Sequence, residues 1–194
     1  MVIDDAFRRF PFLTTNRLRL RQIVPGDAES LFAIRSDDET MKYFGHEPHE
    51  SLDETKGVIK QMEERYIRKE ALHWCITLQE EDRLIGSCNL FHFDEGFDRA
   101  EVGYELNRAF WGKGIMTEAV SAILTFGFRE LRLHRIEAII DIANVRSKNL
   151  LLKLGFTYEG NLRQRFPFRG HFEDEHYFGL LEDEWHGPVH VHKL

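Results

Sequence analysis

Gly112, Lys113 and Gly114 are the residues whose types and spacing point most directly to chemistry. Glycines let the backbone turn so that several N–H groups point into one concavity, and a helical pattern begins directly after them at Ile115. Such a loop suits a pyrophosphate, with Lys113 as a point charge and the Thr117 hydroxyl as a further donor. A dinucleotide fingerprint is disfavoured because Thr117 occupies the place of its third glycine, and a mononucleotide P-loop because Lys113 precedes a glycine rather than Ser or Thr.

Strand and helix patterns on both sides must hold this loop in place. Glu101–Leu106 predicts a strand directly before it, and a long helix follows it. Arg135–Ile142 is nearly continuously apolar, as expected for a strand covered on both faces. Asn144–Leu154 then predicts a helix that ends at Gly155, since glycine suits the left-handed position after a helix. The order of these elements is more informative than the glycines alone.

Patterns elsewhere predict the rest of one domain. Leu18–Ile23 alternates like a half-buried strand, and Asp27 is the expected cap of a short helix after it. Ser51 and Glu54 have the spacing of a capping box, which predicts a longer helix. Further strands are expected at His73–Leu78, Leu84–Phe93, Thr157–Phe168 and His171–Leu181.

With these motifs the sequence resembles the GNAT superfamily of acyl-CoA-dependent N-acetyltransferases, and within it the ribosomal-protein (alanine or serine) N-acetyltransferase branch. The segments that carry the resemblance are Leu13–Leu20, Glu101–Leu106, Phe110–Ala119, Asn144–Ser147 and Leu154–Phe156. The family's phosphate motif is Arg or Gln, two residues, Gly, one residue, then Gly or Ala. The corresponding positions are Trp111, Gly114 and Met116, so the first and the last depart from it.

The resemblance implies an α/β (α+β) fold of the GNAT type. We therefore expect a mixed, mostly antiparallel twisted sheet of six to seven strands, with helices on both faces and a splayed central strand pair. The N-acetyltransferase domain is expected at residues 13–183, preceded by an N-terminal extension at 1–12 and followed by a C-terminal tail at 184–194.

The resemblance also implies acetyl-CoA as cosubstrate and a set of site residues. Glu101 is the expected base, acting through water, with Glu105 in reserve on the same strand face; a solvated or ion-paired carboxylate is the alternative for Glu101. Ser147 is the expected proton donor to the departing thiolate and Asn144 a partner of the pantetheine arm, although either residue would also suit a helix cap. Backbone N–H groups near Leu106 are expected to stabilise the oxyanion. The expected cofactor-binding residues are Leu106, Trp111, Gly112, Lys113, Gly114, Ile115, Met116, Thr117 and Asn144.

The implied reaction is direct attack by a primary amine, which is either a protein N-terminal α-amine or a small amine. An α-amino group, with a pKa of about 7.7–8.0, loses its proton far more easily than a lysine with a pKa of about 10.4. Tyr43, Phe44, His73 and Trp74 are candidates for the acceptor pocket. The alternative from another class is a non-catalytic protein that binds or senses CoA.

Composition limits the partners. The 194 residues suit one domain, and 26 Lys and Arg against 33 Asp and Glu give a charge of −7, which disfavours nucleic acid and anionic membranes and is compatible with an amine. Cys75 and Cys88 are the only cysteines and the sequence shows no membrane-span pattern, so we expect a cytoplasmic monomer or homodimer. His186, His190 and His192 resemble a flexible tail rather than a metal site, and no metal is expected.

Overall fold

In the computed structural model, which describes residues 3–94, 98–187 and 192–193, nine strands form one sheet in the order β7-β8-β6-β5-β4-β3-β2-β1-β9. Neighbouring strands are antiparallel except β5 and β6, which confirms the expected mixed, mostly antiparallel sheet. The strands are β1 (Leu13–Thr14), β2 (Leu18–Gln22), β3 (Ala71–Leu78), β4 (Glu81–Asp94), β5 (Arg99–Leu106), β6 (Arg135–Asp141), β7 (Thr157–Phe168), β8 (His171–Leu181) and β9 (His192–Lys193).

Two very short strands account for the difference from the expected six or seven. β1 and β9 have two residues each and pair with one another at the edge of the sheet, with Leu13 opposite Lys193. Two residues carry no alternating pattern, so only the long-range pairing reveals these strands.

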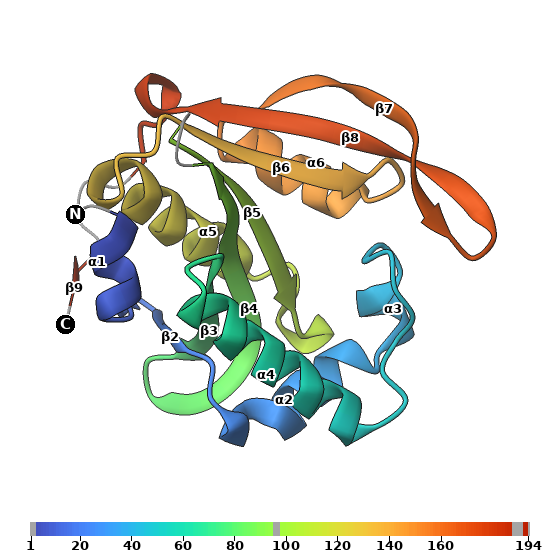
Figure 1. The fold of residues 1–194 in the computed structure, drawn as a ribbon, viewed down its shortest axis with the longest axis horizontal. Coiled ribbons are helices and arrows are strands. Elements are labelled where there is room, and N and C mark those ends of the chain that lie inside the picture. The colour runs from blue at the N-terminus through green and yellow to red at the C-terminus, as the bar shows by residue number, and fades with distance from the viewer. Residues whose placement is uncertain (1–2, 95–97, 188–191, 194) are drawn as a thin grey trace.

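Helices cover both faces of the sheet, as expected (Figure 1). On one face, α2 (Ala28–Arg35) and α4 (Leu52–Ile67) pack with Cys75 and Leu84. On the other face, α5 (Ile115–Thr125) and α6 (Val145–Lys153) pack with Trp74 and Ile76. Shorter segments are α1 (Ile3–Arg8), α3 (Asp38–Met41), η1 (Pro25–Asp27), η2 (Arg108–Phe110), η3 (Phe126–Glu130) and η4 (Glu182–Glu184).

Local signals place most of these helices correctly. The Ser51 hydroxyl accepts a hydrogen bond from the Glu54 N–H at 3.3 Å, which confirms the predicted start of α4. Asp27 is the N-cap residue of α2, as expected, but its carboxylate makes no capping bond and instead accepts two 2.8 Å hydrogen bonds from Arg21 and one from the Val24 N–H at 2.9 Å. The bidentate pair with a largely buried guanidinium orients the carboxylate away from the first N–H groups of α2.

Segments near both ends of the chain pack against the sheet domain. Residue Ala6 of α1 is fully buried, and the Tyr66 hydroxyl donates a hydrogen bond to its carbonyl at 3.3 Å. Near the other end, Trp185 is buried and its indole N–H donates to the Thr125 hydroxyl at 3.3 Å.

The central strands β5 and β6 separate, which confirms the expected splay. Only Arg99–Glu101 of β5 pairs with Arg135–Glu137 of β6, whereas β6 pairs with β8 along its whole length. Figure 1 shows the two strands adjacent at their beginnings and diverging toward their ends.

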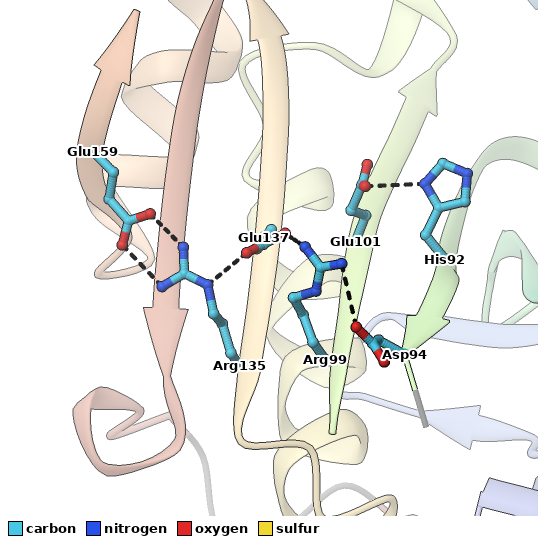
Figure 2. A network of polar contacts seen from close by, with 7 residues as sticks. All are labelled: His92, Asp94, Arg99, Glu101, Arg135, Glu137 and Glu159. Atoms are coloured by element: carbon cyan, nitrogen blue, oxygen red, sulfur yellow. Dashed lines mark hydrogen bonds and ion pairs between the residues drawn. The ribbon is translucent and has the colours of Figure 1, made fainter. Parts of the chain in front are cut away.

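A polar network holds the joined end of the pair (Figure 2). Arg99 and Arg135 both donate to the buried Glu137, at 2.7 and 2.6 Å, and Arg135 also donates to Glu159. Burial favours a higher pKa for Glu137, but hydrogen bonds from Tyr177 and Arg135 and the nearby guanidinium charges lower it below its ordinary value. The network thus joins β5, β6 and β7 at the point from which the splay opens.

Candidate active site

The glycine loop before α5 has the open backbone that a phosphate needs. Gly112 and Gly114 both have φ of 72°, a left-handed conformation that glycine adopts without strain. At Gly112 the position that a Cβ atom would occupy has no atom within 4 Å apart from those of its chain neighbours. At Gly114 the nearest atom to that position is Nη2 of Arg17, at 3.5 Å. The space beside both glycines is therefore open, directly before the first turn of α5.

The other predicted residues of this segment surround the loop in different ways. The Trp111 indole N–H donates to the Leu106 carbonyl at 2.9 Å, which ties the loop to the end of β5. Ile115 and Met116 are buried with their side chains in the core, so only their backbones face the loop. Lys113 is exposed beside the loop, and Thr117 is half-buried in the first turn of α5. The structure therefore brings residues 111–117 and Leu106 together.

Arg17 is an additional residue at this loop. Its guanidinium donates to the Lys113 carbonyl at 3.0 Å and to the Glu118 carboxylate at 2.6 Å. Burial favours a higher pKa for Glu118, but hydrogen bonds from Thr15 and Arg17 lower it below its ordinary value. Arg17 is far from Glu118 in the sequence, and no local pattern indicates the contact.

A cavity of about 630 Å³ passes through the splay between β5 and β6. Asn144 and Ser147, at the start of α6, both line it. The Asn144 side chain accepts a hydrogen bond from the Ser147 N–H at 3.1 Å, so Asn144 caps the helix while facing the cavity. Capping and a cavity-facing position coexist at this residue.

Tyr104 on β5 is a cavity residue that the sequence analysis did not single out. Its hydroxyl lies 2.6 Å from that of Ser147, which is only 7% exposed. Burial raises the pKa of Tyr104 well above its ordinary value, although the hydrogen bond to Ser147 opposes the rise. The two hydroxyls therefore form a protonated, partly buried pair at the wall of the cavity.

The two candidate carboxylates occupy different positions. Glu105 lines the cavity and is 4% exposed, but it accepts hydrogen bonds from Arg35 at 3.0 Å and from the Ser87 hydroxyl at 2.7 Å. Glu101 is not among the residues that line the cavity; its carboxylate accepts a hydrogen bond from His92 at 3.0 Å, beside the joined end of β5 and β6 (Figure 2). The structure therefore brings Ser147 and Asn144 to the cavity and leaves Glu101 beside it.

The acceptor side of the cavity contains three of the four expected residues. Tyr43, Phe44 and His73 line it. Trp74 instead lies in the core on the opposite face of the sheet, and its indole N–H donates to the Pro11 carbonyl at 2.7 Å. Alternation along β3 separates Trp74 from its neighbour His73.

A loop and a hairpin enclose this side of the cavity. Arg169, in the turn between β7 and β8, donates a hydrogen bond to Glu47 at 2.7 Å. The Phe166 ring packs closely on Gly45, only 2.6 Å from the position that a Cβ atom would occupy there. Both contacts join residues 42–49 to the β7–β8 hairpin. Four carboxylates from β6 and β8 also line the cavity: Asp141, Glu173, Asp174 and Glu175. Lys42 and Arg65 line the cavity too, so these carboxylates would attract an ammonium group to the β6 and β8 side of it.

The described residues offer little sign of other chemistry. No group of three or more His, Cys, Asp or Glu among them could hold a metal ion, and His190 of the histidine pattern lies outside the described residues. Cys75 and Cys88 are buried, and burial raises the pKa of both thiols. Within the described ranges, no helix has the length and apolar character needed to cross a bilayer.

Comparisons with known proteins agree with this geometry. A family model described as an acetyltransferase (GNAT) domain matches residues 17–157. The uncharacterized N-acetyltransferase YoaA of Bacillus subtilis is 36% identical over 173 residues, which cover 89% of this chain and 98% of YoaA. YdaF of the same organism, provisionally named a ribosomal N-acetyltransferase, is 28% identical over 182 residues, 92% of this chain and 98% of YdaF. The crystal structure of a GNAT-family acetyltransferase from Bacillus anthracis matches with a TM-score of 0.80 at 28% identity, covering 89% of this chain and 99% of that one.

Proposed function

The chain belongs to the GNAT acetyltransferase family, and we propose that it transfers the acetyl group of acetyl-CoA to a primary amine by direct attack in the cavity between β5 and β6. The observation that carries this proposal is the splay. It opens a passage through the sheet, so that an acyl donor and an acceptor can approach from opposite faces and meet at the unpaired part of β5.

The residues around the splay fit acetyl-CoA. The open glycine loop at 112–114 and the start of α5 would hold the pyrophosphate, with Lys113 adding positive charge. Asn144 would contact the pantetheine arm, and backbone N–H groups near Leu106 would hold the acyl oxygen. When bound, acetyl-CoA supplies a thioester carbonyl carbon that an amine can attack.

Two sets of residues are proposed to move protons. Ser147 donates a proton toward the departing sulfur, and Tyr104 supports it through the 2.6 Å hydrogen bond between their hydroxyls. Glu101 takes the proton of the acceptor ammonium through water. Its partner His92, whose side chain is 61% exposed, gives that proton a route to solvent.

The acceptor is proposed to be an α-amine, either at a protein N-terminus or on a small molecule. An α-amine is neutral far more often than a lysine side chain near pH 7, and only the neutral form attacks. The carboxylates of β6 and β8 and the rings of Tyr43 and Phe44 favour a positively charged acceptor entering the cavity. The provisional name of YdaF supports a protein N-terminus as the first acceptor to test.

The test is release of the CoA thiol from acetyl-CoA in the presence of different amines. The panel pairs peptides that have a free N-terminus with the same peptides blocked by N-acetylation, and adds polyamines and amino acids. We expect turnover with free α-amines and none with the blocked peptides. Tight CoA binding without turnover on any acceptor would refute the proposal and favour a CoA-sensing protein.

A further inference from the structure

Three residues form one row across the sheet at the mouth of the splay. His73 on β3 lies opposite Asn89 on β4, and Asn89 lies opposite Gly103 on β5. Residues opposite one another in antiparallel strands direct their side chains to the same face. All three line the cavity, on the face that α2 and α4 cover.

Gly103 allows the side chain of Asn89 to extend over β5. A Cβ built at Gly103 would lie 2.5 Å from Oδ1 of Asn89, closer than real atoms approach. Gly103 comes two residues after Glu101, the last residue of β5 that pairs with β6. The Asn89 carboxamide is therefore held over the stretch of β5 where the passage through the sheet begins.

Within the described part of the chain, neither polar side chain of this row has a hydrogen-bond partner. His73 is 8% exposed, and its Nε2 is buried without a hydrogen-bond partner among the described residues. None of the hydrogen bonds within the described chain involves the Asn89 side chain, whereas neighbouring Glu105 is occupied by Arg35 and Ser87. A buried polar atom without a partner, such as Nε2 of His73, is costly unless a ligand or water supplies the bond, and the half-buried Asn89 carboxamide beside it is open to the cavity.

We propose that Asn89 and His73 form the subsite that binds the acceptor amine, with the carboxamide oxygen of Asn89 accepting an N–H bond from it. This inference rests on the proposed acetyl transfer and names the residues that position the acceptor. A neutral primary amine has two N–H donors and one lone pair. Binding through its N–H groups leaves the lone pair free to attack across Gly103 toward the splay.

The electrical neutrality of the row suits this task. Burial, together with the charges of Arg65 and Arg35, lowers the pKa of His73 to about 3, so its imidazole is neutral near pH 7. A carboxylate at this point would stabilise the ammonium form, which cannot attack. Neutral acceptor groups bind an amine without holding it in that form.

The main test replaces Asn89 by leucine, which has a similar size and no hydrogen-bonding group. We expect Asn89→Leu to raise the KM for the acceptor about tenfold, the change that loss of one hydrogen bond produces, with an unchanged Kd for acetyl-CoA. Asn149→Leu, at an exposed position of α6, is the matched control and should change neither constant. A role in folding alone would lower the melting temperature and leave the KM unchanged.

A second variant approaches the same site from β5. Gly103→Ala should displace the Asn89 carboxamide and raise the acceptor KM in the same direction, with the melting temperature recorded alongside. If wild-type protein acetylates amines and Asn89→Leu has the wild-type acceptor KM, the subsite is wrong and the proposed function stands. If wild-type protein acetylates no amine, the proposed function fails, and the subsite with it.

Discussion

Replacing Tyr104 by phenylalanine tests whether Tyr104 supports the proposed proton donor Ser147, because the change removes one hydroxyl and keeps the ring. That hydroxyl lies 2.6 Å from that of Ser147 in a partly buried contact, and desolvation of the phenol keeps the pKa of Tyr104 above its ordinary value. A buried hydrogen bond between neutral groups contributes about 1 kcal/mol, and about 1.4 kcal/mol corresponds to a tenfold change in rate. We therefore expect Tyr104→Phe to lower kcat about five- to tenfold.

A double-mutant cycle decides whether Tyr104 acts through Ser147. The assay is kcat for thiol release at saturating amine, with the Kd for CoA and the free energy of unfolding measured for each variant. Ser147→Ala should lower kcat by about 10- to 100-fold, a limited loss because a thiolate leaves without a proton more readily than most leaving groups. In the Ser147→Ala background, Tyr104→Phe should have almost no further effect. Equal effects of Tyr104→Phe in both backgrounds would refute the coupling.

Three further predictions concern the loop, a buried ion pair and pH. Gly114→Val should weaken CoA binding at least about tenfold in calorimetry through strain at φ 72°, whereas Gly57→Ala, in α4, should leave it unchanged. Arg35→Met should lower the free energy of unfolding in urea by about 3–5 kcal/mol, because it leaves buried Glu105 unpaired, and adding Glu105→Leu should restore most of it. Between pH 6.5 and about 3, His73 is protonated in the unfolded chain and neutral in the folded protein, because its folded pKa is about 3. As the pH falls through this range, the free energy of unfolding should therefore decrease by up to about 1.4 kcal/mol per pH unit from this group. Urea titrations of His73→Gln should lack this part of the slope.

Elements defined by local signals could be predicted from the sequence. The cap at Asn144 and the left-handed Gly155 place α6, and the capping box at Ser51 places α4. The turn at Arg169 and Gly170 separates β7 from β8, and both strands have the bounds that the sequence predicts. In each case the decisive interactions lie within a few residues along the chain.

Features that depend on how strands pair could not be predicted in this way. Tyr104 meets Ser147 across 43 residues, and Arg17 meets Glu118 across 101 residues. Alternation places Glu101 and Glu105 on one strand face, but which of them lies at the cavity depends on where β6 leaves β5. That point follows from the pairing of β6 with β8, which no local pattern encodes.

The central claim is that the acetyl group passes directly from acetyl-CoA to an amine. A single-turnover experiment with acetyl-labelled acetyl-CoA and a free α-amine peptide, followed by mass spectrometry of peptide and protein, tests it most directly. Direct transfer predicts the label on the peptide α-nitrogen and none on the protein at any time. Label that accumulates on the protein before the peptide, or that stays on CoA although CoA binds, would contradict it.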